Sequence, residues 1–467
     1  MTVGRSFSSL GRVDAPSRVT IAAEGAGAVT SEAEWHRPAL WEDVPELDLD
    51  GGRLDRVLVV AAHPGDEALG AGGLIAHADA RHIDIHVVLL TAGEASHPDS
   101  PTHSARMLAS IRQAEFRDGL AELAPIATTT FVGLADGQVE AGRDLVVEVL
   151  VDLIGLQGES TLVVAPWRQD GHADHAAAGG GAALAARRTD AQLLEYPVRL
   201  WHRGNPATAP WQQFQQLTLL PHVRARKSAA IAHHCSQTRP LSSSVGDETV
   251  MDDAFLRHFE REREVFVVSK TPEPPKDGGG LERAEPTPWA AIAPWYQHHA
   301  EAVTLASLPR EHFSGALVLG CSLGGLAAGL ARRCGRLVAV DARAPAVAAA
   351  EAALADSDRA QARRLTFPDE WPTGQFDLIV LSESGYTLSP RALRETVARI
   401  RDCLSDDGVL ALGHWRHRTP GWPLSGDAVH DLVLDRVGLH VVAQHRERDL
   451  IVDVLSRRAD GEPLGGW

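Results

Sequence analysis

A histidine and two carboxylates stand close together just after the first apolar run of the sequence. The run RVLVVAAH covers residues 56–63 and continues into PGDEALGAGG, so His63, Asp66 and Glu67 lie on the turn that begins a helix. The end of a strand exposes such side chains, and the spacing lets His63 and Asp66 converge on one point. Imidazole and carboxylate are common zinc ligands. The turn is therefore one half of a candidate metal site.

A second group of such side chains follows the apolar run STLVVAPW (160–167). The group lies in RQDGHADH and consists of Asp170, His172, Asp174 and His175. Two imidazoles and one carboxylate with an open fourth position form the ligand set of catalytic zinc, which lowers the pKa of bound water to about 7. We therefore predict that His63, Asp66 and His175 bind Zn²⁺. The alternative for each segment alone is structural: His63 caps a helix, and HADH is a solvated helix face.

Both segments require a sheet that brings distant strand ends together. In the first half of the chain, short apolar runs alternate with helix-like segments, and TTTFVGLADG continues the pattern. This alternation is typical of βαβ units and predicts an α/β fold with a doubly wound, mostly parallel sheet. Ligands bind beyond the carboxyl ends of the strands in such sheets. The loops at these ends are therefore the expected position of a site.

The composition is that of a globular protein with two or three domains. The chain has 467 residues, of which 44% are hydrophobic and 23% are charged. A domain contains about 150 residues, so more than one core is expected. The 45 basic and 62 acidic residues give a net charge of −17, which repels polyanions and argues against a nucleic-acid partner. A neutral or cationic small molecule fits this charge better.

The cysteines and the N-terminal segment predict a cytoplasmic protein without a membrane span. Cys235, Cys321, Cys334 and Cys403 are scattered and form no CxxC pair, so we expect reduced, buried thiols. No apolar core of a signal peptide begins the sequence, and no later run reaches about 18 uncharged apolar residues. Residues 1–50 are polar and rich in turn formers. They are interpreted as an arm over the next domain, with disorder as the alternative.

A change in composition divides the chain after the first α/β pattern. The segment SKTPEPPKDGGGLERAEPTP is rich in proline and glycine, which favour a linker. Beyond it the βαβ pattern restarts with GALVLGCSLGG, FDLIVLSES and GVLALGHW, and ends with HVVAQHRERDLIVDVLS. The sequence thus predicts two tandem Rossmann-like, doubly wound domains. The predicted parts are an arm at 1–50, a first domain at 51–268, a linker at 269–288 and a second domain at 289–467.

The second domain begins with a glycine-rich turn between two predicted strands. Gly320 and Gly324 follow the first strand, and Asp341 ends the second, about 20 residues further on. Glycine allows a ligand to approach the backbone, and the acidic side chain binds ribose hydroxyls. Tight packing of helix on strand is the alternative. The turn GCSLGG lacks the GxGxxG spacing of dinucleotide sites, so S-adenosylmethionine is the preferred cofactor.

Residues 56–270 resemble the PIG-L (LmbE-like) zinc-dependent de-N-acetylases, which hydrolyse an acetamide on an amino sugar. The matching segments are AHPGDEALGAGG, TAGEASHP, IRQAEFRDGLAEL, LADGQ, DGHADH, EYPVRLWH and RARKSAAIAHHCSQTRPL. The resemblance implies the same metal ligands as the residue types do. It also implies that Arg112 and Asp136 hold sugar hydroxyls and that His172 assists the tetrahedral intermediate. In such chemistry zinc polarises the carbonyl, and a carboxylate takes the proton of the water.

The first domain departs from the family at the residue that takes this proton. The family motif is Ala-His-Pro-Asp-Asp-Glu, with its first aspartate as general base, but Gly65 stands there in this chain. Loss of a positioned base typically slows a reaction about 10²–10⁴-fold. Either Asp170, His172 or Glu67 takes over the role, or the domain binds a sugar without efficient hydrolysis. A smaller departure is Ala92 in TAGE, where an acidic or amide residue is expected.

The stretch EYPVRLWHRGNP (195–206) has two interpretations. It packs in the core with its arginine reaching toward solvent, or, as the resemblance suggests, it forms the wall of a sugar pocket. Core packing is the preferred interpretation.

The second domain resembles class I methyltransferases, and residues 290–457 resemble the nodulation-type N-methyltransferases, which act on de-N-acetylated chitin oligosaccharides. The matching segments are YQHHAEAVTLASLP, GCSLGGLAAGLARRC, VAVDAR, FDLIVLSESGYTLS, GHWRH and LSGDAVH. The resemblance implies that S-adenosylmethionine is bound by Gly320, Ser322, Gly324 and Asp341. Val318 departs from the acidic residue that usually stands two positions before the first glycine.

Three polar residues follow predicted strands that face the expected methyl acceptor. Methyl transfer is a displacement at a sulfonium carbon, so it requires alignment and an unprotonated nucleophile. Glu383, Tyr386 and His414 are candidates to position an amine or to accept its proton. The alternatives are that Tyr386 belongs to the core and that His414 only closes a strand end.

The two predicted chemistries form an ordered pair on one substrate. An amide nitrogen delocalises its lone pair into the carbonyl and is a poor methyl acceptor, whereas hydrolysis frees an amine. The sequence thus predicts a bifunctional enzyme that removes an N-acyl group from a small amino sugar or glycoconjugate and then methylates the amine. Two alternatives remain: the first domain is a sugar-binding module without hydrolysis, or the second is an O-methyltransferase or a degenerate cofactor-binding module.

Overall fold

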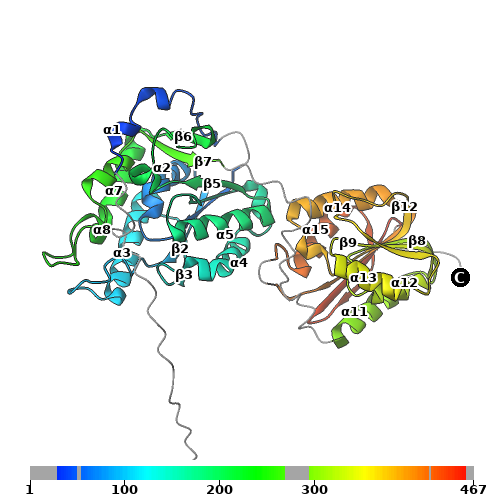
Figure 1. The fold of residues 1–467 in the computed structure, drawn as a ribbon. Coiled ribbons are helices and arrows are strands. Elements are labelled where there is room, and N and C mark those ends of the chain that lie inside the picture. Colours follow the sequence, from blue (N-terminus) through cyan, green and yellow to red (C-terminus); the bar gives the residue numbers. More distant parts are fainter. Residues whose placement is uncertain (1–28, 50–53, 269–293, 420–421, 459–467) are drawn as a thin grey trace, which may run out of the picture.

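The computed structural model describes residues 29–49, 54–268, 294–419 and 422–458, which form two α/β units (Figure 1). Each unit contains a seven-stranded sheet. The strand orders are β3-β2-β1-β4-β5-β7-β6 and β10-β9-β8-β11-β12-β14-β13. Counted from the first strand of each sheet, both orders are 3-2-1-4-5-7-6. The predicted fold class, two tandem doubly wound α/β domains, is confirmed.

The first sheet is parallel except at one edge. Its strands are β1 (Arg56–Ala61), β2 (Asp84–Thr91), β3 (Thr128–Leu134), β4 (Thr161–Pro166), β5 (Gln192–Tyr196), β6 (Phe214–Thr218) and β7 (Arg263–Val267). β7 is antiparallel to both β5 and β6. The longer helices are α2 (Asp66–Ala80), α3 (Ala105–Leu123), α4 (Arg143–Ile154), α5 (Ala173–Thr189) and α7 (Pro221–His233), and the short ones are α1 (Glu32–Trp35), α6 (Leu200–Arg203), α8 (Cys235–Thr238) and α9 (Asp253–Leu256).

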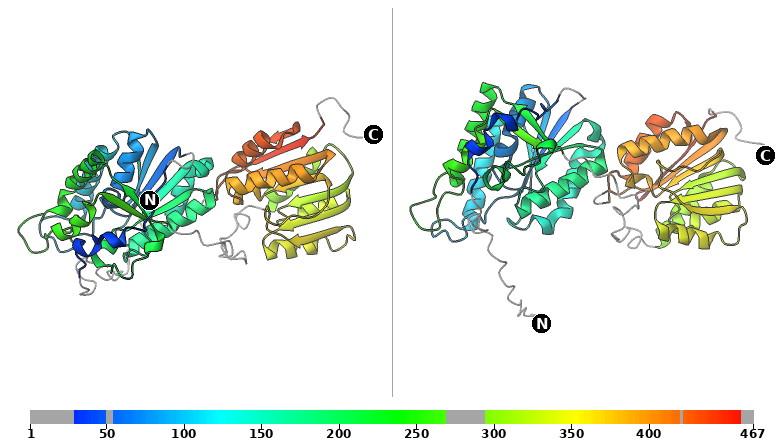
Figure 2. Two further views of the ribbon diagram at one scale, coloured as in Figure 1. Left: turned by 90° about the horizontal axis from the view of Figure 1, so that it is seen from above. Right: turned by 45° about the horizontal axis from the view of Figure 1, so that its top comes forward.

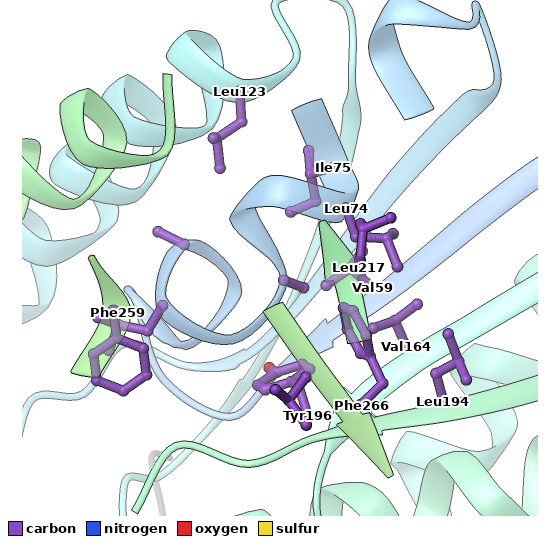
Figure 3. Close-up of a cluster of buried hydrophobic side chains, with 14 of the residues drawn as sticks. Val59, Leu74, Ile75, Leu123, Val164, Leu194, Tyr196, Leu217, Phe259 and Phe266 are labelled. Carbon is purple, nitrogen blue, oxygen red and sulfur yellow. The ribbon is translucent and has the colours of Figure 1, made fainter. Parts of the chain in front are cut away.

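Helices cover both faces of the first sheet because its central strands are apolar on both sides. On one face Val59 and Val164 pack against α2, α3 and α7, as the cluster around Leu74 in Figure 3 shows. On the other face the neighbouring residues Leu58 and Val163 pack against α4 and α5. Successive strand residues point to opposite faces, so both layers are built by the same strands. The sheet is thereby fixed in the core, and its strand ends remain free for polar loops.

The second sheet repeats this arrangement. Its strands are β8 (Phe313–Leu319), β9 (Cys334–Asp341), β10 (Ala360–Arg364), β11 (Phe376–Ser382), β12 (Leu404–Trp415), β13 (His440–Arg446) and β14 (Leu450–Ser456). The described helices are α11 (Pro294–Ser307), α12 (Gly325–Ala331), α13 (Ala344–Ala353), α14 (Pro390–Cys403) and α15 (Gly426–Val437). α11, α12 and α13 share one apolar cluster with the sheet, and α14 and α15 share another, so again both faces are covered (Figure 2).

The end of the chain forms a strand pair. The apolar segment HVVAQHRERDLIVDVLS folds as the antiparallel strands β13 and β14, and β14 is also antiparallel to β12. Residues 447–449 therefore form the turn of a hairpin, because they directly connect these two antiparallel strands. This hairpin brings charged residues of the turn next to β12.

The described part of the predicted arm is attached to the first sheet. Trp35 is fully buried, and its indole N–H donates to the carbonyl of Trp201 over 2.6 Å. Glu32 accepts two hydrogen bonds from Arg261, at 2.6 and 2.7 Å. Residues 29–49 thus pack on the domain, whereas residues 1–28 and the predicted linker at 269–288 lie outside the described residues.

Two further expectations concern cysteines and membranes. Cys321, Cys334 and Cys403 are buried free thiols, as expected, but Cys235 is exposed, because α8 begins with it at the surface. Among the described helices, none combines the length and the apolar character that crossing a membrane requires.

Candidate active sites

The first candidate site lies where β1 and β4 end side by side. β1 pairs in parallel with both β2 and β4, so the order of the strands reverses at β1. In open α/β sheets, ligands bind outside the carboxyl ends of the strands at such a reversal. The turn after β1 carries His63 and Asp66, and the loop after β4 leads into α5 with His175 in its first turn. The fold thus joins two segments that are distant in sequence.

The three predicted metal ligands meet at this edge. His63 Nδ1 lies 3.3 Å and His175 Nε2 lies 3.4 Å from Asp66 Oδ2, and one ligand atom of each residue lies within 4.8 Å of the others. Bonds of 2.0–2.1 Å in a tetrahedral zinc site separate the ligand atoms by about 3.3–3.4 Å. The spacing of these atoms therefore fits a zinc ion.

A buried carboxylate fixes the orientation of His175. Asp170 Oδ2 lies 2.7 Å from His175 Nδ1, so the opposite ring nitrogen, Nε2, faces Asp66. Burial disfavours the charged imidazole, but the charges of Asp66 and Asp170 outweigh it and raise the pKa of His175 to about 9. Asp170 also accepts backbone N–H groups from Val198, Arg199 and Leu200. Such outer partners commonly position the histidine ligands of metals.

Two carboxylates act on His63 in the same way. Asp136 Oδ1 and Asp174 Oδ2 both lie 3.1 Å from His63 Nε2, which leaves Nδ1 toward Asp66. Burial lowers the pKa of His63, but these carboxylates raise it well above its usual value. Burial opposes the charge of Asp136, yet His63 brings the pKa of this carboxyl down to about 2. Asp136, predicted to hold sugar hydroxyls, thus lies against a metal-ligand candidate.

His172 is held as a hydrogen-bond donor at the edge of the cluster. It is the N-cap of α5, and its Nδ1 accepts the backbone N–H of Asp174 over 3.1 Å. Burial and the neighbouring imidazoles of His175 and His63 lower the pKa of His172 to about 3. The ring is therefore neutral, and with Nδ1 accepting, its proton is on Nε2. The ring centres of His172 and His175 are 4.8 Å apart, so this donor belongs to the site.

Glu67, predicted as a substitute base, contacts the turn after β1 and His234. It is fully buried; its Oε2 accepts the backbone N–H of Gly65 over 2.9 Å, and its Oε1 lies 3.5 Å from His234 Nε2. Neither Glu67 Oε1 nor His234 Nε2 has a hydrogen-bond partner. His234 lies in the AHHCSQ segment of the family resemblance, but no pattern in the sequence indicates this contact.

Arg112 connects loops. Its guanidinium donates to the carbonyl of Gly93 and, over 2.6 Å, to Gln237 Oε1, and it is 4% exposed. The predicted contact of Arg112 with a sugar hydroxyl remains a prediction, and only its buried Nε lacks a partner. The structure therefore gives Arg112 a clear role in holding the turn after β2 to α8.

Gly65 is required by the backbone of the turn in this chain. It is the N-cap of α2, with φ of 104°, where side chains other than glycine are strained. A Cβ at this position would meet Gln237 Nε2 at 3.4 Å and His234 Nδ1 at 3.5 Å, which are ordinary contacts. An aspartate here is thus disfavoured by backbone strain and not by lack of space.

The segment after β5 packs in the core, in agreement with the preferred interpretation. Tyr196 is fully buried and donates its hydroxyl to the carbonyl of Val60 over 2.7 Å. Glu195 is buried and accepts two hydrogen bonds from Arg168, at 2.8 and 2.9 Å. Trp201 contacts the described part of the N-terminal segment.

The second candidate site lies at the corresponding edge of the second sheet, after β8. Gly320 and Gly324 have φ of 87° and 85°, and Ser322 adopts 44°. A Cβ on Gly320 would come within 2.4 Å of Ser384 Oγ, so only glycine fits there. This turn brings the backbone close to the end of β11. A ligand can therefore approach main-chain groups on both strands.

Asp341 ends β9 with both of its oxygens engaged. Arg343 donates from Nε over 3.0 Å and from Nη2 over 3.1 Å to this carboxylate. Asp341 is 5% exposed, so a ribose that hydrogen-bonds to it has to share or displace Arg343. Val318 is fully buried within β8 and packs in the core. The predicted cofactor residues thus lie at one strand-end edge.

Glu383 and Tyr386 lie together beyond β11. Tyr386 donates its hydroxyl to Glu383 Oε2, and the backbone N–H of Trp415 reaches the same oxygen over 3.3 Å. Tyr296 of α11 donates to Glu383 Oε1 over 2.9 Å. Burial raises the pKa of Glu383 to about 7, and the hydrogen bonds oppose this shift only in part. Tyr296 had no signal of its own, because helix periodicity does not show which loop a side chain reaches.

His414 lies beneath this group. It is fully buried, its Nδ1 lies 3.0 Å from His430 Nε2, and His430 Nδ1 lies 2.6 Å from Asp453 Oδ2. Burial and His430 hold the pKa of His414 well below its usual value. A Cβ on Gly385 would lie 3.1 Å from His414 Nε2, so this nitrogen lies close to the loop that carries Glu383 and Tyr386, and among the described residues it has no hydrogen-bond partner.

A protein-family model matches each of the two domains. The family described as GlcNAc-PI de-N-acetylase (PIG-L) matches residues 58–186, and a methyltransferase-domain family matches residues 317–410. A comparison with curated proteins found no match.

Solved structures resemble each half separately. A methyltransferase from Pseudomonas syringae is 40% identical and covers 35% of this chain and 99% of its own, with a TM-score of 0.32. The N-methyltransferase NodS from Bradyrhizobium japonicum WM9, in complex with S-adenosyl-L-homocysteine, is 22% identical over 39% and 98%, with a TM-score of 0.34. The N,N'-diacetylchitobiose deacetylase from Pyrococcus horikoshii is 16% identical over 51% and 92%, with a TM-score of 0.36.

Both resemblances stated from the sequence are confirmed at the level of the family. The PIG-L match covers the strand ends that carry His63 and His175, and the methyltransferase match covers the glycine turn and Asp341. Residues 58–186 thus form a PIG-L domain, and residues 317–410 form a methyltransferase domain.

Proposed function

We propose that the protein is a bifunctional amino-sugar-modifying enzyme. Its first domain removes an N-acyl group with the help of a bound metal, and its second domain methylates the freed amine with S-adenosylmethionine. The observation that carries the proposal is the convergence of His63, Asp66 and His175 at the strand-end edge of a PIG-L domain, where Asp66 Oδ2 lies 3.3 Å from His63 Nδ1 and 3.4 Å from His175 Nε2. The covalent linkage to a methyltransferase domain suggests a shared substrate.

In the first domain, His63, Asp66 and His175 would hold Zn²⁺. When bound, the ion supplies Lewis acidity toward the carbonyl and a nucleophilic hydroxide. Asp136, Asp170 and Asp174 accept the outer N–H groups of the two histidines and keep their inner nitrogens directed at the site. His172 donates its Nε2 proton toward the oxygen on which negative charge develops.

In the second domain, Gly320, Ser322, Gly324 and Asp341 would hold S-adenosylmethionine. When bound, it supplies a methyl group on a sulfonium. The chain has to align the acceptor with this methyl group and leave the acceptor nitrogen unprotonated. Glu383 and Tyr386 lie at the end of the neighbouring strand β11 and are suited to this task.

The order of the steps follows from the chemistry of the nitrogen. An amide nitrogen shares its lone pair with the carbonyl, so an acetamide does not attack a sulfonium readily. Hydrolysis in the first domain has to precede methylation in the second. The second domain therefore consumes the product of the first.

One observation favours a second candidate, in which the first domain binds an amino sugar and hydrolyses little. Gly65 offers no proton acceptor. Asp170 already accepts hydrogen bonds from His175 and from backbone N–H groups. Glu67 faces His234. His172 holds its proton on the nitrogen that is free. In this case the methyltransferase would use amines that are formed elsewhere.

Mass spectrometry of an acetamido glycan tests both candidates. The full-length protein is incubated with N-acetylglucosamine oligosaccharides, Zn²⁺ and S-adenosylmethionine. A product that has lost an acetyl group and gained a methyl group supports the bifunctional enzyme. Methylation of added glucosamine oligosaccharides, without deacetylation of the acetylated ones, supports the second candidate. Methylation of neither glycan would contradict both.

A further inference from the structure

The carboxylate of Glu383 has no basic partner. Its oxygens accept the hydroxyl groups of Tyr296 and Tyr386 and the backbone N–H of Trp415. Within residues 29–49, 54–268, 294–419 and 422–458, no Lys, Arg or His side chain forms an ion pair with it. Both tyrosines are neutral donors, because burial and the charge of Glu383 raise their pKa values. A partly buried carboxylate that lacks a cationic partner costs free energy, unless a ligand supplies the cation.

The walls around this carboxylate are aromatic. The rings of Tyr296 and Trp415 meet edge to face at 4.7 Å, and Tyr386 is stacked on Trp422 at 4.5 Å. Electron-rich ring faces next to a carboxylate attract organic cations. Glu383 itself is partly exposed, so a ligand can reach this aromatic cluster from solvent.

This aromatic cluster around Glu383 also lies next to the predicted methyl-donor turn. Glu383 follows β11 directly, and β11 pairs with β8, which ends at Gly320. Ser384 donates to the carbonyl of Leu319 over 3.0 Å, so the two strand-end loops touch. Glu383 has φ of 52°, an uncommon conformation for a residue with a side chain. Such conformations are retained mainly where a site requires them.

We propose that Glu383, Tyr296 and Tyr386 form the ammonium-binding site of the methyl acceptor and that Glu383 takes the proton of that ammonium. This inference rests on the proposed N-methyltransferase activity and names the residues that select an amine. A hydroxyl acceptor would bring no charge and would leave the carboxylate without a cation. Tyr296 comes from α11 and belongs to the apolar cluster on one face of the β8–β14 sheet, whereas Tyr386 belongs to the cluster on the other face, so the two hydroxyl groups reach Glu383 from different faces.

The proton moves from the acceptor nitrogen to one oxygen of Glu383, which leaves a neutral amine and a carboxylic acid. The freed lone pair then forms a C–N bond with the methyl group while the C–S bond of the donor breaks, and the bonding electrons stay on sulfur. The methylated nitrogen carries the positive charge and releases its extra proton to water. The pKa of Glu383 of about 7 suits this exchange, because a general base works best when its pKa is near the working pH.

Binding measurements on the full-length protein test the proposal. All proteins carry His175→Ala, so that sugar binding at the first domain is impaired equally, and S-adenosylhomocysteine is present. We expect calorimetry to detect glucosamine but not N-acetylglucosamine. Glu383→Gln should weaken glucosamine binding about ten- to a hundredfold, because a hydrogen bond to a charged group is lost. Tyr296→Phe should weaken it by a smaller factor.

Glu447→Gln is the matched control. Glu447 lies on the same domain but accepts hydrogen bonds from His299 at 2.8 Å and His445 at 2.6 Å, so it already has imidazole partners. This variant should bind glucosamine as its parent does. Unchanged glucosamine binding by Glu383→Gln would overturn the proposal.

A second measurement separates the acceptor from the donor. If Glu383→Gln loses affinity for S-adenosylmethionine but keeps its affinity for glucosamine, the carboxylate recognises the sulfonium and the proposal is wrong. The proposed function fails separately: a methyl ether as the product of the parent protein would exclude N-methylation, and N-methylglucosamine formed equally by Glu383→Gln would exclude only the role of Glu383.

Discussion

The two sheets share one strand order but differ in how charge is arranged at the same edge. In the first sheet, His63 and His175 are surrounded by carboxylates at 2.7–3.4 Å, so positive and negative groups are paired before any ligand binds. In the second sheet, the partners of Glu383 within the described part of the chain are two neutral hydroxyl donors and a backbone N–H. The first edge is arranged to fix ligand atoms around a cation, whereas the second requires a ligand that brings its own positive charge.

The turns after the first strands show the same contrast. Both begin a helix at a glycine with positive φ, Gly65 before α2 and Gly324 before α12. The first turn also carries His63 and Asp66, whose side chains point to one place, while the second carries Gly320 and exposes backbone. One topology thus places converging side chains at the strand-end edge of one domain and allows close backbone approach in the other.

The largest effect is expected from removing a metal ligand. His175→Ala should lower zinc affinity more than about a hundredfold, since even the outer partners of ligating histidines contribute about ten- to a hundredfold. Elemental analysis after dialysis measures the bound zinc. Binding of S-adenosylmethionine should be unchanged, because the ligands belong to the first domain alone. Retention of one zinc per chain by this variant would contradict the predicted ligand set.

Restoring the family aspartate tests whether Gly65 limits the deacetylation rate of the first domain. Gly65→Asp is expected to raise the deacetylation rate about 10²–10⁴-fold, the usual contribution of a positioned base. The strain at φ of 104° should cost about 1–3 kcal/mol of stability. Gly65→Asn is the matched control, because it has the same strain without the base. Equal rates for both variants, measured by release of acetate, would show that position 65 does not govern hydrolysis.

Asp341→Ala tests the cofactor side of the second domain. We expect about a ten- to hundredfold loss of affinity for S-adenosylmethionine, because hydrogen bonds to a charged acceptor are removed. Calorimetry measures this loss, and the zinc content of the same sample should be unchanged. Affinity equal to that of the parent would mean that Arg343 keeps Asp341 from the ribose.

The smallest expected effect is a pH-dependent change in the stability of the folded protein when Glu383 is replaced. The carboxyl of Glu383 has a pKa of about 7 in the folded protein and 4.5 as its usual value. The folded state therefore binds more protons between these values, so stability falls as the pH rises from 4.5 to 7. Glu383→Gln should stabilise the protein by about 1–2 kcal/mol at pH 8 and by little at pH 4.5. Thermal unfolding at the two pH values checks this, and a pH-independent difference would contradict the assigned shift.

Much of the fold was predictable because strand patterns are local. The apolar runs near residues 56, 83 and 160 form β1, β2 and β4, and the strand-end rule predicts a site at His63, Asp66 and His175, whose ligand atoms lie within 4.8 Å of one another. Residue types and spacing sufficed here, since zinc ligation uses few side-chain types. The strand pair β13 and β14 was less evident, because its two strands form one nearly continuous apolar segment.

The side-chain partners were not predictable, because they depend on packing between distant elements. Glu67 was a candidate base, and only the structure shows that it lies 3.5 Å from His234, between α7 and α8. Arg112 was predicted to hold a sugar hydroxyl, and only the structure shows that its guanidinium donates to the carbonyl of Gly93, after β2. Local sequence does not encode which face of a loop is covered by another helix.

The sequence by itself determined the two α/β domains, the metal-ligand types and the glycine turn, because each depends on the order of nearby residues. Only the tertiary structure decided that Asp170, Asp136 and Asp174 orient the two histidines and that Tyr296 reaches Glu383. The reason is physical: a hydrogen bond acts over about 3 Å, and residues far apart in sequence come that close only when the sheets and helices have packed.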